Sequence, residues 1–500
     1  MTSRIAKENH LPVTVPAPCP VTPQARLRRF LRWGAVAGAA FVLSGCILTS
    51  DLPNPALDVP PAYQAPKDAR APAPKLDWWR GFRSRELTAL MEEARAANLD
   101  MAAAAARIRQ ADAQARVTGA ALLPSLSGGL DASRSQSSAS GGSGTVGGAR
   151  VRDSLSASLA ASYQLDFWGQ NRDALLAAEE TAGASRFDHD VVALTAFAAV
   201  ATAYFQVLAT QDRIRIASNN IANAQRVLDA IRQRLQAGTG SDLDVAQQES
   251  VLANQKAAVP VLRQTLAQNR HALATLIGRP PESTPVRGGS LSGVSAPRVS
   301  PGLPSELLLQ RPDIRRQEFL LAAATANIGS ARAQFFPNIT LTGQGGYQSV
   351  ALAALFTPHA AFYTLAAGLT QPIFDGGRIL ANFELTQARQ DELLQTYRLT
   401  VVSAFADVNT ALVAVRESAE RLRLQREVVA ASRRAFALAE QQLRAGTVDI
   451  VTVLNTQLTL FQAEDALAQA QLARLLAIVS LYQALGGGWE PIMERPVDAL

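Results

Sequence analysis

Strict alternation of apolar with small or polar residues marks four short segments of the chain, arranged as two pairs. The first pair covers about 124–134 and 153–166, and the second about 337–349 and 361–373. A period of two is the pattern of a β-strand whose faces meet different surroundings. We therefore expect four strands in two hairpins, with apolar faces that point outward if the setting is lipid. The alternating positions are Leu126, Gly128 and Leu130; Leu155, Ala157, Leu159, Ala161, Tyr163 and Leu165; Ile339, Leu341, Gly343, Gly345 and Tyr347; and Phe362, Thr364, Ala366, Gly368 and Thr370.

Each hairpin leads into a helical stretch longer than any helix of a compact globular domain. Residues 171–237 contain no proline and a single glycine, Gly183, and residues 378–445 contain neither. At about 1.5 Å per residue, each stretch would span roughly 100 Å. Apolar residues at a stride of seven predict coiled-coil packing along both helices. They are Val200, Val207, Ile214, Ile221, Leu228 and Leu235, and then Leu394, Val401, Val408, Val415, Leu422, Val429, Phe436 and Leu443.

Three sequence echoes in the same order indicate that the chain is two copies of one unit. Leu235–Thr239 resembles Leu443–Thr447 at an offset of 208. Ala121–Leu126 resembles Gln334–Ile339 at 213, and Phe167–Arg172 resembles Ile373–Arg378 at 206. A period this long is the signature of a duplicated structural unit.

The same succession of elements is expected in both copies. A helix precedes each hairpin, at about 85–121 and 312–334, and a glycine-containing turn after each long helix leads into a shorter helix, at 242–277 and 449–485. The predicted domains are a first repeat at 78–285, a linker at 286–302, a second repeat at 303–485 and a polar tail at 486–500.

The N-terminal region changes the meaning of the charge. The chain has 48 Lys+Arg and 42 Asp+Glu, a net charge of +6. Residues 1–45 carry +5 of this, and a basic cluster there precedes an apolar run, Trp33–Leu43, that is too short to span a bilayer. This pattern predicts a signal peptide. The remainder is near neutral, which removes the argument for nucleic acid as a partner.

The end of the apolar run predicts a lipid anchor. Leu43–Cys46 reads LSGC and resembles the lipobox of bacterial lipoproteins, so Cys46 is the expected lipidation site. Cys19 would leave with the leader, so no disulfide forms within the mature chain. The proline-rich segment that follows, within 46–77, suits an extended tether. Apolar residues make up 48% of the sequence, which excludes wholesale disorder.

Four strands cannot close a membrane barrel, because the smallest membrane barrels use eight. An unpaired strand edge in lipid is prohibitively costly, so these hairpins must close with those of other subunits. The predicted fold class is therefore mainly α with a membrane β-barrel part. It is built from a duplicated unit of β-hairpin plus very long coiled-coil helices, and three copies give twelve strands.

Two further segments carry a family resemblance. Gly302–Ile314 reads GLPSELLLQRPDI, and Ala331–Gly343 reads ARAQFFPNITLTG. With Leu43–Cys46 and Trp78–Phe82, they resemble the TolC-like outer-membrane factors of tripartite efflux pumps, and within them the NodT or OprM-like lipoproteins. The resemblance covers about 78–485.

This resemblance implies a homotrimer with a twelve-stranded barrel and a helical periplasmic tunnel, lipid-anchored in the outer membrane of a Gram-negative bacterium. It also implies passive export of drugs or other small molecules. The partners implied are a periplasmic adaptor, an inner-membrane pump of RND type and outer-membrane lipid.

The two helix turns are the first candidate sites. Ala237, Gly238 and Thr239 are repeated as Ala445, Gly446 and Thr447. Glycine permits the left-handed backbone of a tight reversal and leaves room for an adaptor hairpin. Helix capping alone would account equally for the glycines, but the repetition of the whole triplet favours a docking role.

The helix after the second turn is expected to narrow the tunnel. In the family this helix often has an Asp and an Arg in the pattern Leu-Asp-Ala-Gln-Arg, whereas Val453–Leu458 here reads VLNTQL, with Asn455 in place of Asp and Leu458 in place of Arg. We expect Val451 and Asn455 to line the aperture without an acidic ring. Asp242 and Asp244 are candidates for acidity there, although residues beside a helix N-terminus are more often caps.

No catalytic constellation is evident, and the sequence predicts no enzyme, cofactor or metal site. The four histidines are scattered, at His10, His189, His271 and His359, and no phosphate-binding loop or nucleophile elbow is present. Two other functions remain open. The same architecture serves channels of type I protein secretion, and a coiled-coil envelope scaffold is a more distant alternative, for which the strands would have no use.

Overall fold

The structure is a computed structural model that describes residues 52–57, 59–63, 75–136, 151–283 and 286–487 of the 500-residue chain. The predicted signal peptide at 1–45 and the predicted lipidation site Cys46 lie outside these residues. So do parts of the tether, most of the loop between the first two strands, and most of the polar tail.

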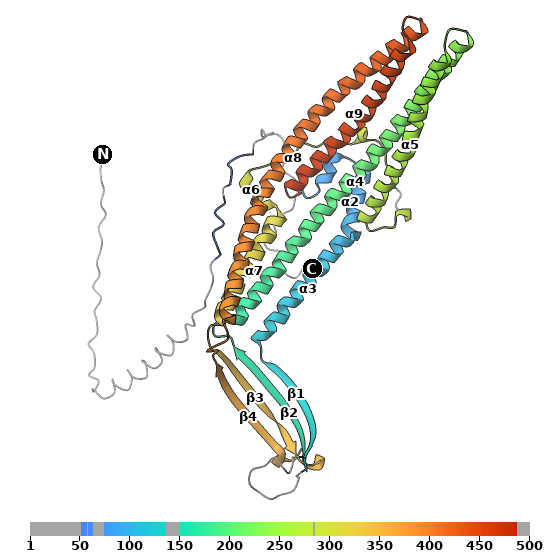
Figure 1. Ribbon diagram of the computed structural model, residues 1–500. Coiled ribbons are helices and arrows are strands. Elements are labelled where there is room, and N and C mark those ends of the chain that lie inside the picture. The colour runs from blue at the N-terminus through green and yellow to red at the C-terminus, as the bar shows by residue number, and fades with distance from the viewer. Residues whose placement is uncertain (1–51, 58, 64–74, 137–150, 284–285, 488–500) are drawn as a thin grey trace, which may run out of the picture. The chain divides into compact units, whose positions relative to one another are not determined.

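Helices make up most of the described chain, and both repeats have the same order of elements (Figure 1). The first repeat contains α2 (Arg85–Ala97), α3 (Leu99–Gly119), β1 (Ser125–Gln136), β2 (Val151–Leu165), α4 (Gln170–Gln236) and α5 (Asp242–Leu276). The second contains α6 (Pro304–Gln310), α7 (Pro312–Ala333), β3 (Asn338–Ser349), β4 (Ala361–Thr370), α8 (Arg378–Arg444) and α9 (Ile450–Ala484). A 3₁₀ helix, η1 (Trp78–Phe82), precedes α2.

The expectation of one helix at about 85–121 is wrong, because two helices occupy this stretch. The backbone is extended at Asn98 (φ −65°, ψ 124°), between α2 and α3. The Asn98 side chain accepts a hydrogen bond from the Met101 backbone N–H at 2.9 Å. Asn98 is therefore an N-cap that starts a new helix.

The duplication has a constant offset along the helical part. The long helices α4 and α8 have 67 residues each, and α5 and α9 have 35 each; both pairs are offset by 208 at both ends. This corrects the alignment of Phe167–Arg172 with Ile373–Arg378, for which the sequence suggested an offset of 206. The equivalent residues are Gly169 and Gly377, also 208 apart, which are the N-caps of the long helices with φ of 84° and 85°. The first repeat has five more residues between Pro124 and Gly169 than the second has between Pro337 and Gly377.

The four strands form one antiparallel sheet in the order β1-β2-β3-β4. The two predicted hairpins are thus present and are joined by pairing of β2 with β3. Figure 1 shows the strands side by side, with α4 following β2 and α8 following β4.

The strand register corrects the predicted face of β4. Leu341 pairs with Ala367 and Gly343 with Leu365, so the odd-numbered residues of β4 share a face with Leu341. The apolar positions of β4 are therefore Tyr363, Leu365 and Leu369. The alternating set predicted for this strand, Phe362, Thr364, Ala366, Gly368 and Thr370, lies on the opposite, polar face.

The predicted seam of α8 is buried at every position except Val415, which is partly buried. In α4, Val200, Val207 and Leu228 are buried, whereas Ile214, Ile221 and Leu235 are partly buried. The single glycine of α4 has a packing reason. A Cβ at Gly183 would collide with the ring of Phe319 on α7, so the glycine lets these two helices approach closely.

The largest core lies where η1, α2, α4, α5 and α9 meet. Trp78 stacks on Tyr482 with ring centroids 4.9 Å apart, and Phe82 and Phe205 lie 5.0 Å apart. Burial raises the pKa of Tyr482 to about 12. The linker is fastened to the same region, because the Asp212 carboxylate accepts hydrogen bonds from the Ser290 hydroxyl and the Leu291 backbone N–H.

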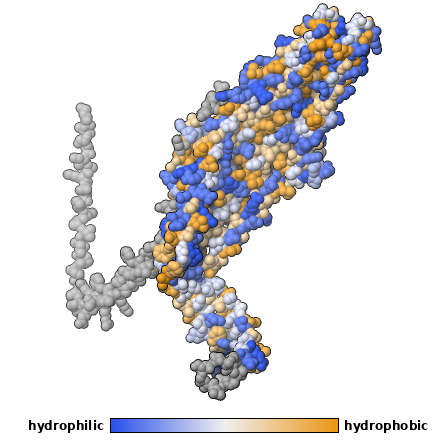
Figure 2. Space-filling model, in the orientation of Figure 1, coloured by the Kyte–Doolittle hydropathy of each residue, from blue (hydrophilic) through white to orange (hydrophobic). Residues whose placement is uncertain are grey.

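Two helices, α4 and α8, contain an apolar stretch that is long enough to cross a membrane by length and composition alone. In α4, 61% of that stretch is buried within the chain, as in the core helix of a soluble protein. Figure 2 shows hydrophobic and hydrophilic residues intermixed over the visible face of the helical part. Large apolar side chains are exposed on the sheet, among them Leu126, Leu130, Leu159, Leu365 and Leu369.

Candidate functional site

The two predicted turns have the same backbone geometry. Gly238 and Gly446 have φ of 75° and 72°, and each follows the C-cap alanine of a long helix, Ala237 or Ala445. The next residue, Thr239, donates its backbone N–H to the Arg234 carbonyl at 2.9 Å, and Thr447 donates equivalently to Gln442 at 3.0 Å. This is the Schellman pattern of helix termination, which requires a left-handed residue.

The turns present little besides small side chains. An added Cβ at Gly238 or Gly446 would meet no atom within 4 Å, so the space beside both glycines is open. The hydroxyl groups of Thr239 and Thr447 donate back to the carbonyls of Arg234 and Gln442, both at 3.1 Å. The geometry therefore explains the glycines by capping alone and also leaves a small, accessible surface.

The acidic residues beside the turns are at helix N-termini. The Asp244 carboxylate accepts from the Ser241 backbone N–H at 3.1 Å, while the Ser241 hydroxyl accepts from the Asp244 N–H at 3.2 Å, which is a capping box. Asp242 is the exposed first residue of α5. Asp449 caps α9, and hydrogen bonds from the Thr452 hydroxyl and backbone N–H lower its pKa.

Val451 and Asn455 lie one turn apart on an exposed face of α9. Leu458 and Gln462 continue this face, at spacings of three and four residues, whereas Val453 and Leu460 are buried. We name Val451, Asn455, Leu458 and Gln462 the exposed stripe of α9. The structure places both predicted aperture residues on it and leaves Asp242 and Asp244 on another helix, α5.

A groove that no sequence pattern indicated lies between the two repeats. It has a volume of about 430 Å³ and is lined by residues of α4, α5 and α9, including Leu458 and Gln462. The Arg213 guanidinium donates to both carboxylate oxygens of Asp465 there, at 2.6 and 3.1 Å. These partners are 252 residues apart, so no local sequence pattern could have indicated the pair.

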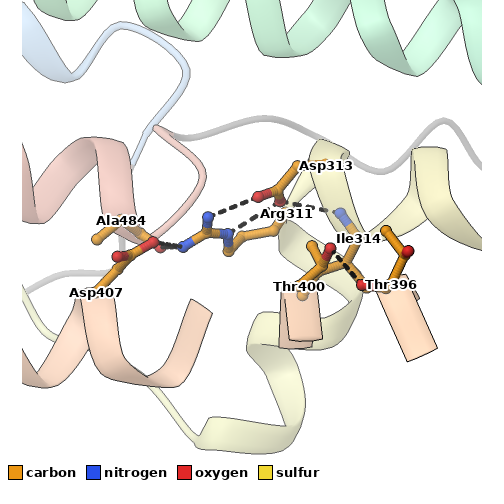
Figure 3. A network of polar contacts seen from close by, with 7 residues as sticks. All are labelled: Arg311, Asp313, Ile314, Thr396, Thr400, Asp407 and Ala484. Carbon is orange, nitrogen blue, oxygen red and sulfur yellow. Dashed lines mark hydrogen bonds and ion pairs between the residues drawn. The ribbon is translucent and has the colours of Figure 1, made fainter. Parts of the chain in front are cut away.

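Arg311, in the segment Gly302–Ile314 that carries the family resemblance, is the centre of a polar network (Figure 3). The guanidinium of Arg311 donates to both oxygens of Asp313, at 3.0 and 2.6 Å. It also donates to an oxygen of Asp407 on α8 at 3.1 Å and to the Ala484 carbonyl of α9 at 3.2 Å. Arg311 is 12% exposed, so this mostly buried cation joins the start of α7 to two other helices.

The described residues contain no group of three or more His, Cys, Asp or Glu that could hold a metal ion. Of the four histidines, His189 has its Nδ1 atom 3.3 Å from an Oδ1 atom of Asp190, the next residue in the chain. His10 lies outside the described residues. The strongest polar constellations are thus the capping and ion-pair networks described above.

Residues 90–279 and 303–487 match the family described as outer membrane efflux protein. The pyoverdine export outer membrane protein OpmQ of Pseudomonas putida is 42% identical over 455 residues, which cover 90% of this chain and 96% of the relative. The cation efflux system protein CusC of Escherichia coli is 30% identical and covers 90% of this chain and 97% of its own. The toluene efflux pump outer membrane protein TtgC of Pseudomonas putida is 31% identical, with 91% and 95% covered.

Solved channels share the fold. The Neisseria gonorrhoeae MtrE outer membrane channel superimposes with a TM-score of 0.77 at 32% identity, covering 88% of this chain and 98% of that one. A crystal structure of CusC gives a TM-score of 0.78 at 29% identity, covering 89% and 100%. These similarities confirm the fold class expected from the sequence, mainly α with a β-barrel part, and the chain itself is mostly helical with one small antiparallel sheet. The chain belongs to the outer membrane efflux protein family and is the outer-membrane channel component of an efflux system.

Proposed function

We propose that three copies of this chain close one twelve-stranded barrel in the outer membrane, continued by a helical tunnel in the periplasm. The sheet carries this proposal. Its order leaves β1 and β4 with one unpaired edge each in the described chain. Unpaired backbone groups in lipid cost several kcal/mol each, and four strands cannot close on themselves. Three sheets joined edge to edge leave no strand unpaired.

The helices at the two sheet edges support the same assembly. The helix α3 leads into β1 and exposes Leu99 and Val117. The helix α8 follows β4 and exposes Leu399, Val402 and Val413. When β4 of one copy pairs with β1 of the next, α8 and α3 of these copies become neighbours. Their apolar side chains then leave water, which is a favourable change.

Within this assembly the chain is a passive conduit for small molecules, and the energy comes from its partners. We assign these as a periplasmic adaptor and an inner-membrane pump of RND type. The relatives support small molecules as the cargo, since they are named for pyoverdine export, toluene efflux and cation efflux.

The assembly is tested on the full-length protein purified in detergent and reconstituted in planar bilayers. We expect a mass of three copies and discrete conductance steps. A monomer without conductance would refute the channel. Export of a protein rather than small molecules from cells that carry the complete system would reassign the cargo to type I secretion.

The adaptor is proposed to dock on the two turns at Ala237, Gly238, Thr239, Ala445, Gly446 and Thr447. Their open, small surface supports this. A bulky charge, as in Ala445→Glu, should abolish export while the trimer and its conductance persist. Gln441→Glu, exposed one turn earlier, is the control. Equal export by both variants would show that the turns serve capping only.

The exposed stripe of α9 is proposed to line the closed aperture. Val451 and Asn455 would face the pore axis, with Asp242 and Asp244 supplying acidity from α5. Replacing Val451 and Asn455 together by alanine should raise the single-channel conductance, because smaller side chains widen the narrowest point. An unchanged conductance would remove both residues from the aperture.

Cys46 is proposed to carry the lipid that anchors the chain to the outer membrane. The lipobox pattern at Leu43–Cys46 supports this. Mass spectrometry of the mature N-terminus should detect an acylated cysteine that is lost in Cys46→Ser. A soluble periplasmic product of that variant, without a barrel in the membrane fraction, would favour the scaffold alternative.

A further inference from the structure

One face of the sheet is polar, and Phe362 is the exception on it. The register aligns Gly129, Ser158, Gly346 and Phe362 in one row across the four strands. Among the strand residues that the structure describes, every other residue on this face is Ser, Thr, Gly, Ala, Gln, Asn, Asp or Arg. The next residue, Tyr363, lies on the opposite, apolar face with Leu365 and Leu369. Phe362 is therefore the one large apolar side chain on the polar face of the described strands.

The neighbours of Phe362 across the sheet are too small to cover its ring. Its neighbours in the row, Gly346 and Ser158, are small, and no side chain extends from Gly346 to cover it. Phe362 is partly buried, whereas the other nine residues of β4 are exposed. The residue is thus partly shielded by the protein and partly open to solvent.

Phe362 also has a defined place along the strand. It is the second residue of β4, and α8 follows the other end of the strand. Thr370 lies eight positions further along the strand, which corresponds to about 26 Å. The ring lies near the end of the sheet that is farthest along the strand from the long helices.

We propose that Phe362 faces the lumen near the outer mouth of the channel and is a contact site for planar aromatic cargo. This rests on the proposed barrel, whose interior is the polar face. Twelve strands enclose a wider space than the eight-stranded barrels that side chains can fill, so three rings would not block the passage. In a lumen of polar side chains and water, each ring offers stacking, which a planar aromatic molecule can use and an aliphatic one cannot.

The test uses the full-length trimer in planar bilayers, with current blocks recorded as ethidium, a planar aromatic cation, is added to either side. Tetraethylammonium, a non-aromatic cation of the same charge, is the reference probe. We expect ethidium blocks of the wild type from one side, and a dwell time about 2- to 10-fold shorter in Phe362→Leu, which keeps an apolar side chain but has no ring. Phe362→Trp should keep or lengthen the dwell time.

Tyr363→Ser is the matched control, since it removes an aromatic ring next in sequence but on the opposite face. It should leave the ethidium dwell time unchanged, and no variant should alter block by tetraethylammonium. Equal dwell times for wild type and Phe362→Leu would overturn the contact site, and a loss in Tyr363→Ser alone would show that the faces are reversed. Absence of any wild-type channel would instead refute the proposed barrel.

Discussion

The two repeats fasten their last helix to their first in the same place but with different chemistry. In the first, the Asn98 side-chain amide donates to the Leu276 carbonyl at 2.7 Å. In the second, Arg311 donates to the Ala484 carbonyl at 3.2 Å. The donors are 213 residues apart and the acceptors 208, which are the offsets of the duplication before and after the hairpins. The contact therefore belongs to the repeated unit, and only its chemistry differs.

The difference follows the burial of the long helices. Arg311 also binds Asp407 on α8, whereas the position equivalent to Asp407 in α4 is Ala199. The apolar stretch of α4 is 61% buried within the chain, but that of α8 is only 22% buried. Apolar packing holds α4 in place. The helix α8 has less apolar packing and is held to the rest of its repeat by the ion pair between Arg311 and Asp407. Of the two long helices, α8 therefore keeps more apolar surface exposed, and in the proposed assembly this surface faces α3 of the next copy.

Removing the ion pairs of Arg311 should have the largest effect on the stability of the protein. In Arg311→Met, the carboxylates of Asp313 and Asp407 lose their shared cation. We expect a loss of about 3 kcal/mol, at the low end for a broken buried pair because Asp407 is half-exposed. Thermal unfolding of the detergent-solubilised protein measures it. Arg423→Met, which breaks two surface ion pairs on α8 with Glu420 and Glu427, should leave the midpoint nearly unchanged, and equal effects of the two variants would contradict the distinction.

Removing the neutral hydrogen bond between Asn98 and Leu276 should destabilise the protein less. Asn98→Ala removes the hydrogen bond to Leu276 and the N-cap of α3, and leaves no charge without a partner. We expect about 2 kcal/mol from the lost cap and bond. The same thermal assay ranks it below Arg311→Met. A larger loss of stability in Asn98→Ala than in Arg311→Met would contradict this ranking.

Gly183→Ala probes a close helix approach in α4 that the equivalent position of α8 lacks. The added methyl group meets the Phe319 ring, and overpacking of this kind costs about 1 to 3 kcal/mol, partly offset by the better helix propensity of alanine. The equivalent position in α8 is Asp391, which is exposed. Asp391→Ala is thus the control and should be close to neutral. Equal midpoints for the wild type and Gly183→Ala would show that the Gly183–Phe319 approach is not tight.

The smallest effect is expected at the second turn. Hydrogen bonds from Thr452 lower the pKa of Asp449 from its usual 3.8, so its capping contribution is complete above that value and is lost as the pH falls through the lowered pKa. Asp449→Asn should remove this pH dependence. Amide hydrogen exchange in the first turn of α9 measures it, compared at pH 5 and below pH 3. An identical pH response in wild type and variant would rule out the cap as its source.

The sequence by itself determined the duplication, the lengths of the long helices, their seams and the four strands. Each of these rests on a period that repeats over many residues, so local chemistry is enough to reveal it. The sequence also singled out the two glycine turns through a repeated triplet, whereas Arg311 was only one residue of the segment that carries the family resemblance. The docking role of the turns stays a prediction, and so does the aperture role of Val451, Asn455, Asp242 and Asp244.

Only the tertiary structure decided the rest. Both faces of β4 carry an aromatic residue, Phe362 or Tyr363, so alternation could not choose between them and pairing with β3 did. The need for Gly183 arises from Phe319, and the groove ion pair joins Arg213 to Asp465 across 252 residues. These features depend on which segments meet in the folded chain. Residues that are far apart in the sequence leave no local pattern that would reveal such contacts.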